Sequence, residues 1–259
     1  MGILNITPDS FYDGGKYMNT KNAINQIEKM INNGVDIVDI GAASSRPFSK
    51  AITIDEERKR LEPILNEVQK KYPDTTISVD TYKSEIAKLA IDLGATIIND
   101  IYGGNYDKEM LPFIAKNNIP YILMHMKGEP LDMQKNIKYD HFENEIITFF
   151  KEKKIKLESM GHTNLIIDPG FGFGKTLKQN FKLVNLIPKI KKIHKNILVG
   201  ISRKSMIYKS LQTNPYESLN GTSVLNTICI LNGANFIRVH DVKECKEVVK
   251  MINLVKNNS

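Results

Sequence analysis

The sequence has few of the features that mark several common protein classes. It contains two cysteines in 259 residues, Cys229 and Cys245. They show no metal-ligand spacing and fall in expected helices, so we predict two buried, reduced thiols. No apolar run approaches the roughly 20 residues that a membrane-spanning helix needs. No basic stretch precedes an apolar one at the N-terminus, as a signal peptide would require. We therefore expect a soluble, cytoplasmic protein with no membrane partner.

Several catalytic patterns are missing as well. The sequence shows no Ser-His-Asp order typical of a hydrolase and no cluster of His and Cys ligands. The stretch GFGFGK at Gly170–Lys175 is not a nucleotide motif, because Pro169 and Lys175 occupy positions where the Walker and dinucleotide patterns need glycine. We predict instead a close approach of the backbone beside Asp168.

The formal net charge is +7, and the sequence pI is about 9.1. The lysines are scattered through expected helices, as at 151–156 and 189–195. This favours a solvated, lysine-rich surface over a nucleic-acid-binding face. A positive field would also favour an anionic small-molecule substrate.

Short runs of branched apolar residues recur along the chain. They predict eight strands, at 2–7, 35–42, 77–81, 97–101, 121–125, 165–169, 197–202 and 236–241. Apolar residues at three- and four-residue spacing predict helices between them, at about 21–33, 55–72, 84–93, 108–117, 140–161, 179–194, 218–232 and 243–256. A glycine follows four of these helices, where a left-handed cap would lie: Gly34, Gly94, Gly161 and Gly233.

Strand and helix alternating eight times in this length indicate an α/β protein with a (β/α)8 TIM barrel. The repeat occupies residues 1–259, so we predict a single domain whose chain starts directly at the first barrel strand. An open, doubly wound sheet is the alternative, because periodicity does not show closure.

Polar residues stand near the end of each predicted strand. They are Asn5, Asp39, Asp80, Asn99–Asp100, His125, Asp168, Ser202–Lys204, Arg238 and His240. In a barrel these ends converge on one face, from which catalytic residues come. The alternative is that the carboxylates cap helices. Arg238 and His240 share one face of the last strand and suit a phosphate, since Arg offers a fork of donors and His can donate and respond to pH.

The motifs at these ends resemble the dihydropteroate synthase family. They are MGILNITPDSFYDGG, SVDT, IIND, LMHMKGEP followed by Met133-Gln134, DPGFGFGK, GISRKSMI and IRVHDV, in the family's order. The resemblance implies a barrel enzyme of folate biosynthesis, usually a homodimer using Mg²⁺. Such an enzyme condenses 6-hydroxymethyl-7,8-dihydropterin pyrophosphate with p-aminobenzoate, giving 7,8-dihydropteroate and pyrophosphate.

The resemblance also implies roles for individual residues. The pterin would be bound by Asp80, Asn99, Asp168 and Lys204. The pyrophosphate would be bound by Asn5, Ser45, Arg238 and His240, with Asn5 also beside the Mg²⁺. The p-aminobenzoate side would comprise Phe11, Arg46, Pro47 and Ser205. The residues taking part in catalysis would be Asp80, Asp168, Lys204, Arg238 and His240.

We expect a dissociative displacement of pyrophosphate. The leaving group would be stabilised by Mg²⁺, Arg238 and His240, and a cation-like pterin by the negative potential of Asp80 and Asp168. Loops 8–17 and 42–51 would close over the site.

The sequence departs from the family in its second loop. The family commonly reads like GGESTRPG here, whereas this chain has GAASSRPFSK at Gly41–Lys50. Ala43 therefore occupies the position of an acid, and Ser45 that of a threonine. Sensitivity to sulfonamides, which mimic p-aminobenzoate, therefore stays open at this point. Two alternatives remain: a pterin-binding methyltransferase domain, and a non-catalytic pterin-binding paralogue.

Overall fold

The computed structural model describes residues 1–6, 16–43, 51–135 and 137–258, with the backbone alone for 16–19. All eight predicted strands are present, most of them shorter than expected. They are β1 (Gly2–Asn5), β2 (Ile37–Gly41), β3 (Thr76–Asp80), β4 (Ile97–Asp100), β5 (Tyr121–Met124), β6 (Leu165–Asp168), β7 (Leu198–Val199) and β8 (Phe236–Ile237).

The strands close into a barrel. Strands β1 to β6 form a parallel sheet in chain order, and β7 pairs in parallel with β8. Isolated parallel bridges join the two sheets at both edges, from Gly2 to Val239 and from Ile167 to Ile197. The (β/α)8 prediction is confirmed, and the open sheet is excluded because a doubly wound sheet reverses its strand order and leaves two edges apart.

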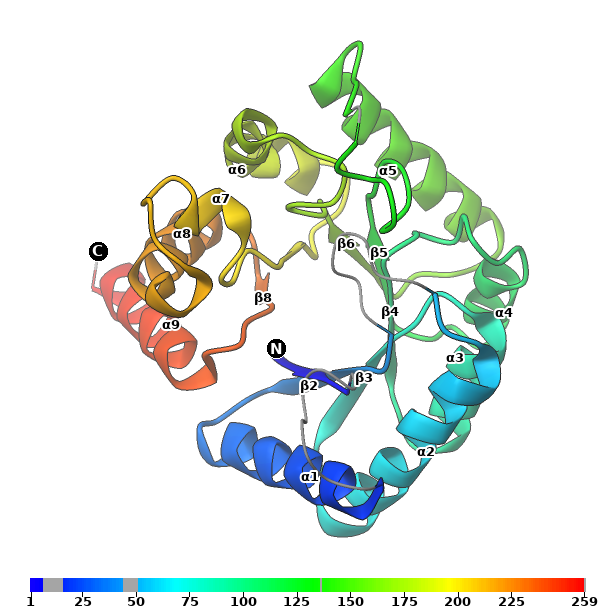
Figure 1. Cartoon of the computed structure of the whole chain (residues 1–259). Helices are drawn as coiled ribbons and strands as arrows, with labels where there is room; N and C mark the ends of the chain where they lie inside the picture. The colour runs from blue at the N-terminus through cyan, green and yellow to red at the C-terminus, as the bar shows by residue number, and fades with distance from the viewer. Residues whose placement is uncertain (7–15, 44–50, 136, 259) are drawn as a thin grey trace.

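Helices surround the strands (Figure 1). They are α1 (Lys16–Asn32), α2 (Ile54–Lys71), α3 (Ser84–Asp92), α4 (Met110–Lys116), α5 (Phe142–Ser159), α6 (Leu177–Lys191), α8 (Leu219–Leu231) and α9 (Val242–Asn257). Two short elements, α7 (Ser205–Tyr208) and the 3-10 helix η2 (Pro215–Glu217), lie between β7 and α8. The sequence pattern gives no sign of η2, because three residues are too few for a period. No helix in the described part of the chain is long and apolar enough to cross a membrane.

The ends of the helices follow local chemistry. The capping side chain of Thr176 accepts a hydrogen bond from the backbone of Gln179, and the Gln179 side chain accepts one from the backbone of Thr176, so a capping box begins α6. The predicted left-handed glycines all have positive φ, between 77° and 113°: Gly34, Gly94, Gly161 and Gly233. These signals fix the lengths of the helices around the barrel.

The interior of the barrel has an apolar lower layer. It is a cluster separate from the main core between strands and helices, and it contains Met1, Ile97, Ile122, Ile166 and Leu198. Side chains alternate along a strand, so Asn99 shares the inner face with Ile97, and Asp168 shares it with Ile166. An apolar layer therefore supports polar side chains at the carboxyl ends of the strands.

Candidate active site

The polar residues of the first strands lie in one row at the barrel mouth. The register places Asn5 opposite Gly41, Gly41 opposite Asp80, and Asp80 opposite Asn99. Asp168 ends β6 on the same side of the barrel. Four residues predicted from widely separated motifs are thus brought to one end of the barrel, where TIM-barrel active sites form.

Arg238 follows β8 and makes ion pairs with two carboxylates. Its Nε donates to Oδ2 of Asp39 at 2.6 Å, and its Nη2 donates to Oδ2 of Asp80 at 3.1 Å. Asp39 is fully buried in β2. The sequence analysis counted Asp39 among the polar strand ends and assigned it no role in the site. Its partner stands 199 positions away, which no local pattern reveals.

The surroundings of Asp80 change its acidity. Burial raises the pKa of Asp80 to about 7, the Arg238 guanidinium opposes this, and the like charge of Asp39 adds to it. An aspartate ordinarily titrates near pH 3.9, so the Asp80 carboxyl can exchange a proton near neutral pH. Such shifts are typical of functional sites.

Lys204 and Asp168 form a second pair of opposite charges at the mouth. The Lys204 ammonium donates to the Phe171 carbonyl and lies 4.6 Å from the centroid of the Phe173 ring. Burial lowers the pKa of Lys204 to about 8, with Asp168 opposing the shift. Burial also raises the pKa of Asp168, against the charge of Lys204. Each group is therefore less firmly ionised than it would be in water.

The glycine-rich loop after β6 packs tightly, as predicted. The Gly170 amide donates to Asp168 Oδ1 at 2.8 Å. A Cβ at Gly170 would lie 2.0 Å from the His125 carbonyl oxygen, so no side chain fits there. The buried Lys175 ammonium donates to three backbone carbonyls, including those of His125 and Gly170. Lys175 therefore holds the loop that orients Asp168.

His240 is an exposed residue at the mouth. Its Nδ1 is 3.0 Å from the Ser202 hydroxyl, which also accepts the His240 backbone N–H at 3.2 Å. Burial lowers the pKa of His240 to about 4, and the charge of Arg238 adds to the effect. In the chain alone the lowered pKa favours the neutral ring, and the response of His240 to pH beside a bound anion stays a prediction.

Two polar strand ends do not face the mouth. Asp100 Oδ2 accepts hydrogen bonds from the Tyr121 hydroxyl at 2.6 Å and the Gly104 amide at 2.8 Å. The His125 ring packs edge-on against Phe149 of α5, with centroids 5.0 Å apart. The prediction that the polar ends of all eight strands converge is wrong for these two, because strand side chains alternate and theirs point toward the helices.

The structure places Asn5 half-buried at the end of β1. Within the described residues, no group of three or more His, Cys, Asp and Glu side chains is arranged to hold a metal. Any hard cation at the mouth would thus need further oxygen ligands besides the side chains of the described residues.

Several predicted residues lie outside the described part of the chain. These are Phe11, Ser45, Arg46 and Pro47, together with most of the expected loops 8–17 and 42–51. Ser205 is described: it is exposed at the start of α7, directly after Lys204.

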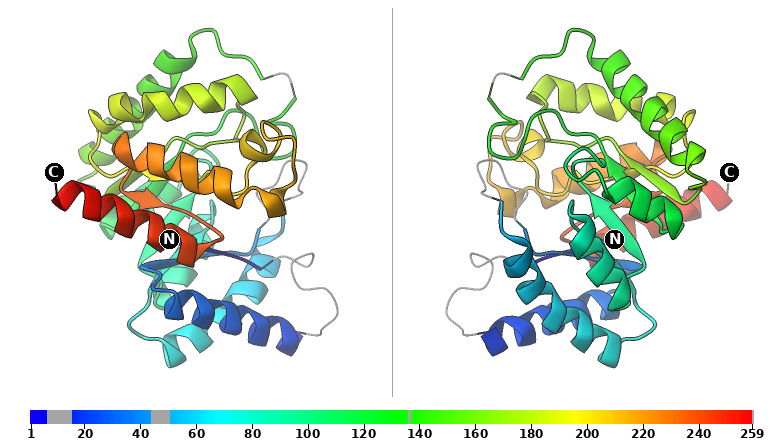
Figure 2. Two further views of the ribbon diagram at one scale, coloured as in Figure 1. Left: turned by 90° about the vertical axis from the view of Figure 1, so that its left-hand side faces the viewer. Right: turned by 90° about the vertical axis from the view of Figure 1, so that its right-hand side faces the viewer.

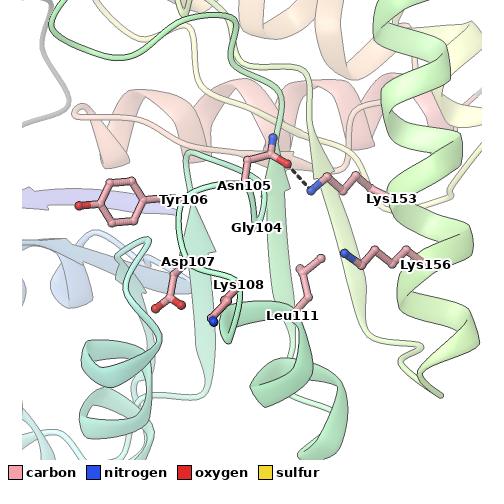
Figure 3. Close-up of a pocket in the computed structure, with 8 residues that line it drawn as sticks. All are labelled: Gly104, Asn105, Tyr106, Asp107, Lys108, Leu111, Lys153 and Lys156. Atoms are coloured by element: carbon pink, nitrogen blue, oxygen red, sulfur yellow. Dashed lines mark hydrogen bonds between the residues drawn. The ribbon is translucent and has the colours of Figure 1, made fainter.

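A separate cavity of about 570 Å³ lies between the β4–α4 connection and α5 (Figure 3). Its lining comprises Gly104, Asn105, Tyr106, Asp107, Lys108, Leu111, Lys153 and Lys156. Lys153 Nζ donates to Asn105 Oδ1 at 2.5 Å. None of the predicted site residues lines this cavity, so it is distinct from the polar mouth.

Comparison with known proteins gives matches along nearly the whole chain. Residues 1–240 match the family described as pterin binding enzyme. The chain is 40% identical over 258 residues to dihydropteroate synthase of Clostridium beijerinckii, covering 98% of this chain and 93% of that protein.

Solved structures agree with the sequence matches. Yersinia pestis dihydropteroate synthase in a sulfonamide drug complex superposes with a TM-score of 0.91 at 35% identity, covering 99% of this chain and 93% of that one. Clostridium difficile dihydropteroate synthase, crystallised in the presence of pteroic acid, has a TM-score of 0.92 at 36% identity, covering 98% and 95%.

Proposed function

Because the chain belongs to the dihydropteroate synthases, pterin-binding transferases of folate biosynthesis, we propose that the polar mouth of its barrel is where the condensation occurs. Dihydropterin pyrophosphate and p-aminobenzoate enter, and dihydropteroate and pyrophosphate leave. This assignment rests on one observation, the convergence of charged and amide groups at the strand ends. Asp80, Asn99 and Asp168 are buried there, and Lys204 and Arg238 are partly buried.

The pterin site follows from complementary hydrogen bonding. The edge of a pterin presents ring nitrogens, an amino group and a carbonyl. Asp80 and Asp168 can accept from its N–H groups, Lys204 can donate to its acceptors, and Asn99 can add an amide contact. These groups are largely buried, so a ligand that failed to pair them would leave costly unsatisfied atoms. This supports selectivity for the pterin ring.

The proposed condensation depends on stabilising the charges of the departing pyrophosphate and of the pterin cation more than on proton transfer. Arg238 and His240, with Ser45, would bind the pyrophosphate. The bond from the pterin methylene carbon to the pyrophosphate oxygen breaks, and the electron pair leaves with pyrophosphate. The resulting pterin cation is stabilised by Asp80 and Asp168. The arylamine nitrogen then forms the new bond to carbon and releases its proton to solvent. An arylamine is neutral near pH 7, so no strong base is required.

We also propose Mg²⁺ as the cofactor, with Asn5 as its protein ligand. An amide oxygen suits this hard cation, which commonly completes its shell with water and substrate phosphates rather than a protein cage. Bound there, Mg²⁺ would neutralise charge on the pyrophosphate. The half-buried Asn5 in the same row as Asp80 supports this placement.

Pyrophosphate release from dihydropterin pyrophosphate tests the function. We expect release with formation of dihydropteroate when p-aminobenzoate and Mg²⁺ are both present, and a large loss of turnover after chelation of the metal by EDTA, restored by added Mg²⁺. Pterin binding without any turnover would instead support a non-catalytic paralogue.

The two alternatives have less support. A non-catalytic pterin binder has no need of the groups that suit pyrophosphate, yet Asn5, Arg238 and His240 are all present at the mouth. A methyltransferase domain would lack the SRKS motif at Ser202–Ser205 that this chain carries.

The proposed pterin site predicts a bell-shaped pH dependence. We expect kcat/KM for dihydropterin pyrophosphate to rise as Asp80 ionises near pH 7 and to fall as Lys204 loses its proton near pH 8. Lys204→Arg should remove the alkaline fall, because a guanidinium stays protonated. Steady-state rates between about pH 6 and about pH 9 measure this, and a flat native profile would contradict it.

The p-aminobenzoate side is assigned to Phe11, Arg46, Pro47 and Ser205. The sulfonamide complex of the Yersinia pestis relative supports sulfonamide binding here as well. We further propose that residues 1–259 form one domain that works in the cytoplasm. The family match over 1–240 and the two free, buried cysteines support this.

We propose that the chain forms a homodimer through α8 and α9, which lie side by side on one face (Figure 2). A groove of about 820 Å³ runs along them. Large apolar side chains are exposed on both helices: Val224, Ile228, Leu231, Met251, Leu254 and Val255. Water-exposed apolar surface of this kind is typical of association sites.

Leu231→Glu tests this surface, since Leu231 is 62% exposed and lines the groove. We expect the variant to sediment as a monomer at concentrations where the native chain is a dimer, because a charge would be buried at the interface. Ile155→Glu on α5, at a residue that is 65% exposed, is the matched control and should stay dimeric. A native chain that sediments as a monomer would contradict the proposal.

A further inference from the structure

Asp39 links three strands and Arg238 inside the barrel. It lies in β2 and is fully buried. Its Oδ1 accepts from the Ser78 hydroxyl at 2.6 Å, and its Oδ2 accepts from Asn99 Nδ2 at 3.1 Å and Arg238 Nε at 2.6 Å. One carboxylate therefore joins β2 to β3, to β4 and to the residue that follows β8.

These bonds determine how Asn99 is turned. An amide group has a donor end and an acceptor end, and Asp39 takes the donor end. The acceptor, Asn99 Oδ1, is buried and has no hydrogen-bond partner among the described residues. A buried carbonyl left unpaired is costly, and such exceptions call for an explanation. A ligand N–H at the mouth would supply the missing partner.

The same carboxylate fixes Arg238. With Nε on Asp39 and Nη2 on Asp80, the guanidinium is held between two acids from neighbouring strands. Asp39 is entirely shielded from solvent, whereas the Arg238 side chain is 18% exposed. The arginine can therefore reach a ligand at the mouth while the acid behind it cannot.

We propose that Asp39 is a positioning residue for the condensation. It turns the Asn99 amide so that the oxygen accepts from an N–H of the pterin ring, and it holds Arg238 beside Asp80. Asp39 itself does not touch the substrate. The inference depends on the proposed function, because it assigns the unpaired Asn99 oxygen to the pterin.

Asp39→Asn tests the proposal, because it places an amide where three donors meet. The Asn99 amide group is then no longer held with its nitrogen toward position 39 and can rotate. We expect KM for dihydropterin pyrophosphate to rise by about tenfold or more, the value of roughly one lost hydrogen bond. KM for p-aminobenzoate should stay near that of the native chain. Ser78→Ala removes just the third donor to Asp39 and is the matched control, with both KM values near native.

A reciprocal swap separates orientation from a general structural role. In the double variant Asp39→Asn/Asn99→Asp, the amide at position 39 can donate to the carboxylate at position 99, which still presents an oxygen to the ligand. The same amide nitrogen cannot accept from Arg238 Nε, so the swap restores the bond to position 99 and not the bond to Arg238. We therefore expect this variant to recover part of the loss in KM for the pterin substrate. An Asp39→Asn variant with unchanged KM, or a swap with no recovery at all, would overturn the proposal.

The positioning role of Asp39 and the proposed function are refuted by different results. A native chain that forms no dihydropteroate refutes the function, whereas native turnover with an unaffected Asp39→Asn variant refutes the positioning role alone. If Asp39→Asn does not fold, a neutron crystal structure of the native chain with bound pteroic acid decides, because it distinguishes the amide nitrogen of Asn99 from its oxygen. Asn99 Oδ1 on a pterin N–H supports the inference, and Asn99 Nδ2 on the pterin overturns it.

Discussion

Replacing Arg238 with alanine is expected to lower kcat/KM for dihydropterin pyrophosphate by about ten- to more than a hundredfold. A hydrogen bond to a charged group contributes about 1.5–3 kcal/mol, and this residue is proposed to bind the departing pyrophosphate. The substitution also removes the cation between Asp39 and Asp80, whose oxygens lie 2.6 and 3.1 Å from its nitrogens. The pKa of Asp80 should then rise further, since Arg238 is the charge that lowers it.

Steady-state kinetics with each substrate varied in turn would measure this effect. Arg58→Ala is the control, because Arg58 is a half-exposed arginine paired with Glu85 on the surface, and its kinetics should match the native chain. Arg238→Lys should recover little, because an ammonium cannot bridge two carboxylates as a guanidinium fork does. Unchanged turnover in Arg238→Ala would refute the proposed role.

Replacing Lys83 with methionine is expected to cost about 3–5 kcal/mol of folding free energy, the usual penalty for removing one partner of a buried ion pair. Lys83 Nζ lies 2.7 Å from Glu57 Oε2 and 2.6 Å from the Ile52 carbonyl oxygen. The Glu57 side chain is 0% exposed and also accepts from the Thr81 hydroxyl at 2.7 Å. Without Lys83, a carboxylate remains buried between α2 and the end of β3 with no counter-charge.

Urea unfolding followed by circular dichroism would give the free energy of unfolding. The double variant Glu57→Gln/Lys83→Met should be more stable than Lys83→Met alone, because it removes the uncompensated charge. Lys71→Met breaks the exposed Glu67–Lys71 pair, which lies in α2 like Glu57. This variant should have no measurable effect on the free energy of unfolding. If Lys83→Met and Lys71→Met unfold at the same urea concentration, the buried pair is not a major source of stability.

Much of the fold follows from local sequence. The strand at 121–124 and the helix that ends before Gly161 depend on side-chain alternation, on helical spacing and on a glycine cap, all of which act within a few residues. The same alternation places Asn99 on the inner face of its strand. It also shows why Asp100 belongs to the outer layer, a consequence that the sequence analysis did not draw.

The candidate site is predictable to a lesser extent. Motifs identify Asp80, Asp168 and Lys204 as polar residues at strand ends, because a strand end is a local feature. The pKa values of these residues, in contrast, depend on residues far away in the sequence. The pKa of Asp80 near 7 arises from burial beside Asp39 and Arg238, and that environment exists once the barrel has closed.

The sequence by itself determined that strands and helices alternate along this protein and that polar residues stand at the strand ends, and it left the closure of the sheet open. Those features are encoded by residue spacing over short distances. The tertiary structure alone decided that Asp39 pairs with Arg238, that Lys175 holds backbone carbonyls rather than a ligand, and that the pKa of His240 is lowered. Each depends on which groups meet, and how deeply they are buried, when segments up to 199 residues apart pack together.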